Sequence, residues 1–181
     1  EDSIRPLIEE RMNTYQEVRP LAILDGGKEM IHWSERDGWA HLYLYDGEGN
    51  LKNRITQGPW HVDQIVKVDE KNRVVYFLAN GREKGENPYY EHLYRVNLNG
   101  SGLQLVTKGN YFHAPLVDDN AQFIVNNYSR VNTVPKTELL DNTGRKVMDL
   151  EESDFSQLLA AGYQFPEPFT VKAADGVTDL Y

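Results

Sequence analysis

Cysteine is absent from this sequence of 181 residues. Without cysteine the chain has no disulfide, no thiolate metal site and no cysteine nucleophile. The absence does not fix the compartment, because many exported bacterial proteins also lack cysteine.

Long apolar runs and a surplus of basic residues are missing as well. No apolar segment approaches the ~20 residues that cross a bilayer, so we expect no membrane insertion. Lys and Arg number 19 against 28 Asp and Glu, which gives a net charge of −9. Because phosphate binding needs a basic face, we expect no nucleic-acid partner and no binding to an anionic membrane surface. The charged start, Glu1-Asp2-Ser3, predicts that the chain carries no signal peptide.

The residues that are present are typical of a globular, strand-rich protein. Hydrophobic residues make up 40% and charged residues 26% of the chain, which excludes a disordered composition. The 11 Tyr, 3 Trp and 6 Phe residues lie mostly in short runs with Val, Ile and Leu. Such runs favour the pleated, half-buried surface of a β-sheet.

Short apolar segments alternate with turn-forming residues along most of the chain. Gly, Asn and Asp separate the segments, and these residues tolerate the positive φ of tight hairpins. Strands with a turn every 8–12 residues predict an all-β antiparallel fold. The expected strands are Leu21–Leu24, Met30–Trp33, His41–Tyr45, Gln64–Val68, Val74–Leu78, His92–Leu98, Gln122–Asn126 and Thr137–Asp141.

An internal repeat narrows the fold class. The 18 residues 41–58 align without a gap on residues 92–109, an offset of 51. Both stretches open with His-Leu-Tyr, carry a central glycine and close with Thr-x-Gly, as expected for two equivalent hairpins. An acidic turn between two apolar strands precedes each hairpin, and a third, diverged hairpin follows at residues 137–150.

The repeating unit is therefore four antiparallel strands in roughly 40–50 residues, which is typical of a β-propeller blade. Such sheets bury their faces by packing on one another around an axis. Residues 20–58, 59–110 and 111–150 are expected to form three blades, and residues 1–19 the end of a preceding blade or a connector. Because propellers typically need 4–8 blades, the sequence predicts a partial propeller and hence a piece of a longer protein.

The pattern changes after Leu150. Asp154 is placed to cap a short helix, with Gln157 returning a hydrogen bond and Gly162 ending the helix. The prolines of Phe165-Pro166-Glu167-Pro168 exclude helix, so residues 151–168 are expected to be a helix and linker. Residues 169–181 predict a hairpin that starts a truncated further domain.

Four stretches carry a resemblance to a known family. The residues from His32 to Asp46 resemble the W-S-E-R-D-G-W-x-H-L-Y-x-Y-D stretch of bacterial dipeptidyl-peptidase-IV-like serine peptidases of the prolyl oligopeptidase family. Residues 55–62 match the T-x-G-x-W-x-V segment of these enzymes. Residues 126–132 resemble a later propeller strand and its loop, and residues 169–181 the first hairpin of the α/β-hydrolase domain.

The resemblance implies a function for the parent enzyme. In this family an eight-bladed propeller packs over an α/β-hydrolase domain, whose Ser-Asp-His triad releases dipeptides or tripeptides from peptide N-termini, usually after proline. This chain would hold the last three blades, the connector and the first hydrolase strands. None of its six serines lies in a G-x-S-x-G elbow, so we expect no catalytic residue here and no activity from the chain alone. Peptide substrates, the missing hydrolase domain and a homodimer of the parent are the implied partners, and the periplasm or the extracellular space is the implied location.

Arg19 is the one residue with a case for substrate binding. In the resembling enzymes an Arg on the loop entering this blade reaches the substrate cavity, and a guanidinium suits carbonyl and carboxylate recognition. A structural salt bridge is the competing interpretation of Arg19, and Arg5 and Arg11 are nearby alternatives. The long loop 81–90, with Tyr89 and Tyr90, is expected either to contact a partner or to pack on a neighbouring blade.

The histidines and the acidic turn favour structural roles. His41 and His92 occupy equivalent repeat positions, which indicates packing. No histidine pair has the i, i+4 spacing of a helical zinc site, so we expect neither a metal nor a cofactor. Glu35 and Asp37 would suit a glycosidase only in a shared cavity, and carboxylates at this spacing on a turn usually bind turn amides. A non-enzymatic propeller that binds proteins remains the alternative to the peptidase.

Overall fold

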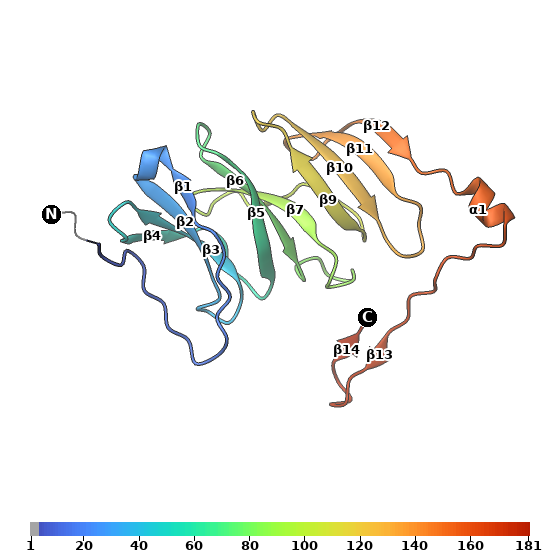
Figure 1. Cartoon of the computed structure of the whole chain (residues 1–181), viewed down its shortest axis with the longest axis horizontal. Helices are drawn as coiled ribbons and strands as arrows, with labels where there is room; N and C mark the ends of the chain where they lie inside the picture. The colour runs from blue at the N-terminus through green and yellow to red at the C-terminus, as the bar shows by residue number, and fades with distance from the viewer. Residues whose placement is uncertain (1–3) are drawn as a thin grey trace.

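The computed structural model describes residues 4–181 as three four-stranded antiparallel sheets, a short helix and a C-terminal hairpin. The three sheets lie side by side, each splayed from the next (Figure 1). This arrangement is the predicted all-β architecture of propeller blades. Within residues 4–181 no helix is long and apolar enough to cross a membrane.

Each sheet follows the chain in simple up-and-down order. The first sheet contains β1 (Ala22–Leu24), β2 (Glu29–Ser34), β3 (His41–Asp46) and β4 (Leu51–Arg54), with the 3₁₀ turn η1 (Asp25–Gly27) after β1. The second sheet contains β5 (His61–Asp69), β6 (Val74–Asn80), β7 (His92–Asn97) and β8 (Gln104–Leu105). The third sheet contains β9 (Phe112–Val117), β10 (Phe123–Ser129), β11 (Lys136–Asp141) and β12 (Lys146–Glu152).

All eight expected segments lie in strands, to within one residue at their ends. Among the strands of the three sheets, β4, β8, β9 and β12 are not in that list of eight. The predicted hairpins account for β4, β8 and β12, whereas β9 is missed because Pro115 interrupts the strand-forming pattern. Pro115 pairs opposite Asn126 on an edge strand, where a missing N–H costs no ladder hydrogen bond on the open side. Strand β12 runs on to Glu152, two residues past the expected end of the third blade.

The repeat found in the sequence makes the same threonine hydrogen bond in both copies. Leu42 N donates to Thr56 Oγ1 at 3.0 Å, and Leu93 N donates to Thr107 Oγ1 at 2.9 Å. In each hairpin the closing threonine therefore ties the end of the fourth strand back to the third. The His-Leu-Tyr and Thr-x-Gly signatures mark this tie, which explains their equal spacing.

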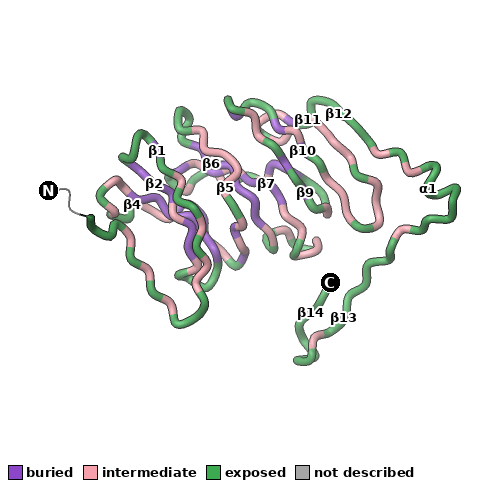
Figure 2. The backbone as a smooth tube through the Cα atoms, viewed as in Figure 1, coloured by how far each residue is buried: buried purple, intermediate pink, exposed green. Residues whose placement is uncertain are grey.

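The core consists of two layers between the three sheets, which the purple segments in Figure 2 trace. Between the first and second sheets the rings of Trp60, Phe77 and Tyr94 stack with centroids 5.8–6.2 Å apart. Between the second and third sheets a smaller cluster contains Tyr76, Leu93, Ile124 and Leu140. The second sheet is thus buried on both faces.

Segment 4–20, which precedes β1, covers the free face of the first sheet (Figure 1). Ile8 packs against Met30, Tyr43 and Tyr45. The carboxylate of Glu10 contacts Ser34 Oγ, lies 3.3 Å from His32 Nε2 and pairs with Arg36 Nε at 3.2 Å. Burial would raise the pKa of Glu10, but the hydrogen bonds from Ser34 and His32 and the charge of Arg36 outweigh it and lower the pKa.

Three hairpin glycines mark equivalent contacts between neighbours. A Cβ on Gly49 would lie 2.2 Å from the Leu7 carbonyl oxygen, and one on Gly144 the same distance from that of Val106. A Cβ on Gly100 would lie 2.9 Å from the Arg54 carbonyl oxygen. Leu7 therefore contacts the first sheet in the way that residues at or just after the fourth strand of one sheet, Arg54 and Val106, contact the next sheet.

The C-terminal part leaves the sheets as a helix, a strap and a hairpin. Helix α1 (Ser156–Ala160) buries no side chain. Its cap position is Phe155 and no side chain caps it, so the predicted cap with a returned bond from Gln157 is wrong in detail; the Asp154 carboxylate instead accepts from Ser156 N at 2.8 Å. Strands β13 (Val171–Lys172) and β14 (Asp179–Leu180) form the expected hairpin.

Candidate functional site

One end of the sheets carries Arg19, the acidic turn and the long loop 81–90, whereas Arg5 pairs with Glu48 in the turn between β3 and β4, at the opposite end. Because the strands alternate in direction, the connections 35–40, 81–91 and 130–135 lie at the same end, together with the links between sheets. The C-terminal hairpin lies at this end too (Figure 1). We call it the hairpin-facing end.

Arg19 lies at this end and forms an ion pair. Its Nη2 donates to Asp63 Oδ1 at 3.2 Å, and its Nε lies 2.8 Å from Glu17 Oε1 without hydrogen-bond geometry. The guanidinium lies 5.5 Å from the centre of the Trp33 ring, and 30% of the side chain is exposed. Arg19 thus has the structural salt bridge expected of the competing interpretation, with part of its fork left open.

Glu91 adds a second carboxyl group near Asp63. Burial, reinforced by the charge of Asp63, raises the pKa of Glu91, and Arg19 opposes this rise. Arg19 therefore reduces the repulsion between the carboxyl groups of Asp63 and Glu91, which is a structural role.

The acidic turn does not form a paired acid site. The Asp37 carboxylate contacts Arg54 and accepts from the Tyr43 hydroxyl at 2.5 Å. Gly38 N closes the turn on the Glu35 carbonyl oxygen at 2.8 Å. Neither residue lines the two cavities described below, so the geometry favours the turn over the glycosidase.

His41 and His92 have the equivalent, buried positions that the repeat predicts. His41 Nε2 lies 2.9 Å from the Gly58 carbonyl oxygen, and His92 Nε2 lies 2.8 Å from Glu86 Oε2. His32 meets Glu10, and the His61 ring meets Trp33 edge to face at 6.0 Å. Among residues 4–181 no group of His, Asp and Glu side chains is placed to hold a metal ion.

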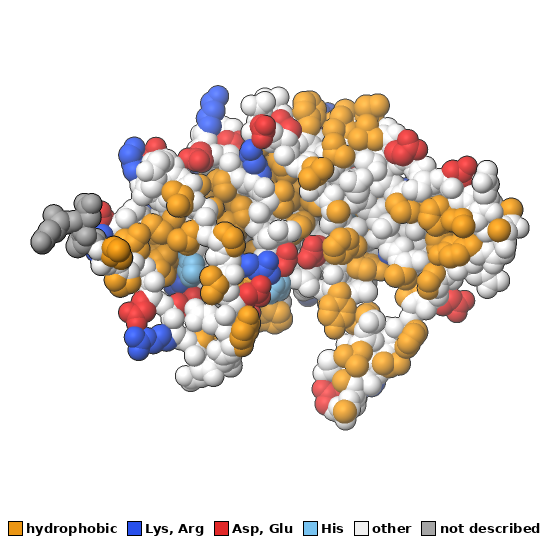
Figure 3. Space-filling model, viewed as in Figure 1, with side chains coloured by type: hydrophobic (Ala, Val, Ile, Leu, Met, Phe, Trp, Pro, Cys, Tyr) orange, Lys and Arg blue, Asp and Glu red, His pale blue; other side chains and the backbone are white. Residues whose placement is uncertain are grey.

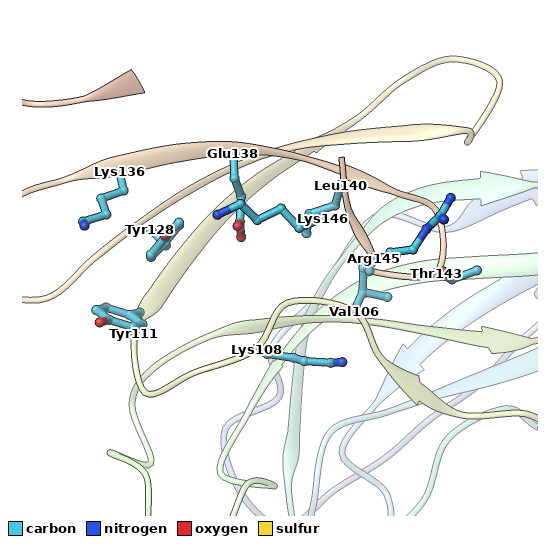
Figure 4. A pocket seen from close by; sticks show the side chains of 11 residues that line it. Val106, Lys108, Tyr111, Tyr128, Lys136, Glu138, Leu140, Thr143, Arg145 and Lys146 are labelled. Carbon is cyan, nitrogen blue, oxygen red and sulfur yellow. The ribbon is translucent and has the colours of Figure 1, made fainter. Parts of the chain in front are cut away.

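A cavity of about 670 Å³ lies between the second and third sheets (Figure 4). Four cationic side chains line it, namely Lys108, Lys136, Arg145 and Lys146. Three of them are neutralised by carboxylates: Lys136 by Glu152 at 3.1 Å, Arg145 by Asp141 at 2.9 Å, and Lys146 by Asp149. Most of the positive charge that lines this cavity is therefore neutralised by carboxylates of the same chain.

A second cavity, of about 850 Å³, lies at the hairpin-facing end. One wall comes from the sheets and the other from the strap and hairpin, which stand away from the sheets in the space-filling view (Figure 3). Tyr89 of the long loop meets Tyr181, which lines the cavity, edge to face at 6.3 Å. The loop with Tyr89 and Tyr90 thus packs against the C-terminal hairpin, and Tyr90 lines the cavity.

Arg130 and Asn132 line this cavity as well, and sequence reasoning missed them. They lie in the turn after β10, in a stretch that the sequence marked only as a propeller strand and its loop. The signal available was an Arg and an Asn two residues apart in a short loop at the same end as Arg19.

Comparisons with known proteins agree with this architecture. Residues 3–135 match the family profile described as the dipeptidyl peptidase IV N-terminal region. A probable dipeptidyl peptidase 4 of Emericella nidulans is 30% identical over 108 residues, 58% of this chain and 12% of that protein. Dipeptidyl peptidase 4 of Arthroderma otae is 41% identical over 56 residues, 31% of this chain and 7% of that protein.

Two solved structures share the fold. The crystal structure of Porphyromonas gingivalis dipeptidyl peptidase 4 matches 86% of this chain and 22% of its own, with a TM-score of 0.69 and 24% identity. A putative dipeptidyl aminopeptidase IV from Bacteroides ovatus matches 88% of this chain and 25% of its own, with a TM-score of 0.69 and 22% identity. The chain thus spans a quarter or less of these proteins. It belongs to the family of dipeptidyl peptidase IV N-terminal regions, as a partial β-propeller.

Proposed function

We propose that this chain is the gating and substrate-access part of a serine exopeptidase that releases N-terminal dipeptides or tripeptides, typically after proline. The observation that carries the proposal is the second cavity, which lies between the sheets and the C-terminal hairpin. The resemblance to the family passes from propeller to hydrolase domain at this hairpin. In the proposed enzyme, a peptide would enter between the two parts, and the α/β-hydrolase domain would supply the nucleophile and the triad.

Hydrolysis by the whole gene product tests this proposal. The open reading frame that encodes the chain is expressed in full and assayed on a Gly-Pro chromogenic substrate, beside the 181-residue chain. We expect turnover only by the longer protein, with a G-x-S-x-G elbow encoded after Tyr181. Turnover by the 181-residue chain would contradict the assignment of catalysis to another domain. No elbow and no turnover would favour the protein-binding scaffold.

Arg19 remains our proposed substrate contact within this function. Its exposed edge and its place at the hairpin-facing end support the role, and Asp63 would hold the guanidinium in position. Arg19→Gln in the active gene product should raise KM several-fold with little change in kcat. An unchanged KM, with a lowered melting temperature, would assign Arg19 to the salt bridge alone.

Location and assembly complete the proposal. We infer that the parent enzyme acts in the periplasm or outside the cell and that it forms a homodimer, on the strength of the family resemblance alone. Cell fractionation and sedimentation of the gene product test these two points independently of activity.

A further inference from the structure

The turn after β10 holds two side chains in a fixed relation. Thr133 N donates to the Arg130 carbonyl oxygen at 3.0 Å, and Arg130 N donates to Thr133 Oγ1 at 3.1 Å. These two bonds close the four residues 130–133 into a turn between β10 and β11. The backbone that carries Arg130 and Asn132 is therefore held in place by the turn.

Both side chains have a buried polar atom without a partner. Arg130 Nε and Asn132 Oδ1 make no hydrogen bond within residues 4–181. The Arg130 guanidinium lies 5.2 Å from the centre of the Tyr111 ring and forms no ion pair with the residues described. Buried donors and acceptors are nearly always satisfied in native proteins, so this pair calls for a partner that brings one acceptor and one donor.

The surroundings narrow the chemistry of that partner. Arg130 and Asn132 line the second cavity, together with Tyr90, Phe169 and the carboxylate-bearing Glu86 and Glu167. The carboxylates and the Asn132 oxygen would repel a free anion such as phosphate. A neutral peptide unit suits the site, because its carbonyl oxygen accepts from Arg130 Nε while its N–H donates to Asn132 Oδ1.

We propose that Arg130 and Asn132 bind the main chain of an extended peptide in the second cavity. The inference rests on the proposed function and assigns two residues that bind its peptide substrate. Tyr111 holds the plane of the guanidinium, and the strap and hairpin form the opposite wall. Because the turn would hydrogen-bond only to the main chain of the peptide, binding should depend little on the side chains of the peptide.

An NMR titration of the 181-residue chain with the tetrapeptide Gly-Pro-Gly-Gly tests the proposal. We expect the Arg130 Nε–H resonance to shift on addition of the peptide. Arg130→Gln, which removes the guanidinium, should weaken binding about tenfold, and Arg130→Lys should restore little, because Lys lacks the planar fork. Asn132→Asp keeps the acceptor and should bind within about threefold of the parent chain, whereas Asn132→Leu should not.

A matched control is Arg145→Gln in the first cavity, which should leave the affinity unchanged. Equal affinities of the Arg130→Gln and parent chains would overturn the inference, also where Arg130→Gln lowers the melting temperature, since Arg130 would then be purely structural. Absence of binding by the parent chain would overturn it too. Neither result bears on Gly-Pro hydrolysis by the whole gene product, so the proposed function stands or fails separately.

Discussion

The outer face of the first sheet is covered by another segment of the chain, whereas the outer face of the third sheet is exposed. The free face of the first sheet lies under segment 4–20, where Ile8 and Glu10 meet apolar and polar partners. On the far face of the third sheet the register places Phe112, Leu116, Phe123 and Met148 on one side, and these side chains are 44%, 68%, 46% and 52% exposed. Hydrophobic side chains also reach the surface over this part of the molecule in Figure 3.

The difference shows what a four-stranded sheet needs. Side chains along a β-strand point alternately to the two faces of the sheet. An apolar face that stays in water loses the hydrophobic stabilisation that the same residues provide when they are packed. A short segment of chain is enough to supply this cover at one end. On the far face of the third sheet no part of segment 4–181 does so.

The largest expected effect compares one residue type in two places. Phe77 is fully buried between Trp60 and Tyr94, whereas Phe123 lies on the uncovered face. Phe77→Ala should lower the free energy of unfolding by ~3–5 kcal/mol, and Phe123→Ala by under ~1 kcal/mol. Urea denaturation followed by circular dichroism measures both. Equal losses would mean that the outer face of the third sheet is packed in solution.

Acid should loosen the covered side of the third sheet. Burial, together with the charge of His92, lowers the pKa of His113 from 6.5 to about 4. Between these values the unfolded chain binds more protons than the folded one, so the free energy of unfolding falls as the pH falls. The loss should reach about 3 kcal/mol by pH 4. His113→Gln, compared with the parent chain from pH 7 to 4, should flatten this dependence; an unaltered slope would assign it to other groups.

Glu10 tests the cover of the first sheet. Glu10→Gln removes the charge that Arg36 and His32 face and should cost about 1–3 kcal/mol of unfolding free energy. The loss should shrink as the pH falls through the lowered pKa of Glu10, because the parent carboxylate is then protonated too. Hydrogen exchange of residues 4–20 should quicken at pH 7. The exposed neighbour Glu9→Gln is the control, and an equal effect there would rule out a specific role for Glu10.

The smallest effect on stability belongs to the bare face itself. Leu116→Lys, at a side chain 68% exposed, should change the unfolding free energy by under ~0.5 kcal/mol. The added charge should lower self-association, because it interrupts an apolar patch. Sedimentation velocity at rising concentration measures this. Equal association of the parent and variant chains would show that the face is not adhesive.

Prediction from sequence succeeded where a residue pattern has one structural solution. The two copies of His-Leu-Tyr and Thr-x-Gly specify the same hairpin tie, because the threonine hydroxyl must reach back to the third strand. The third hairpin lacks this signature and has two register shifts between β11 and β12, which no pattern predicted.

The candidate site was harder to predict, because its contacts join residues far apart in sequence. Arg19 meets Asp63, 44 positions away. The unsatisfied atoms of Arg130 and Asn132 become visible only once every neighbour is placed. Composition and spacing record charge and periodicity, but they do not record which polar group is left without a partner.

The hairpin glycines have a consequence for the shape of the whole propeller. At Gly49, Gly100 and Gly144 main chain meets main chain, with no side chain between to act as a spacer. At these three points the spacing between neighbours is therefore set by direct main-chain contact, with no side chain that could adjust it. Repeated from blade to blade around a propeller axis, such close contacts contribute to the angle between neighbouring blades. An alanine at one of these glycines would wedge two neighbours apart and change the curvature of the ring, even though each sheet could still fold.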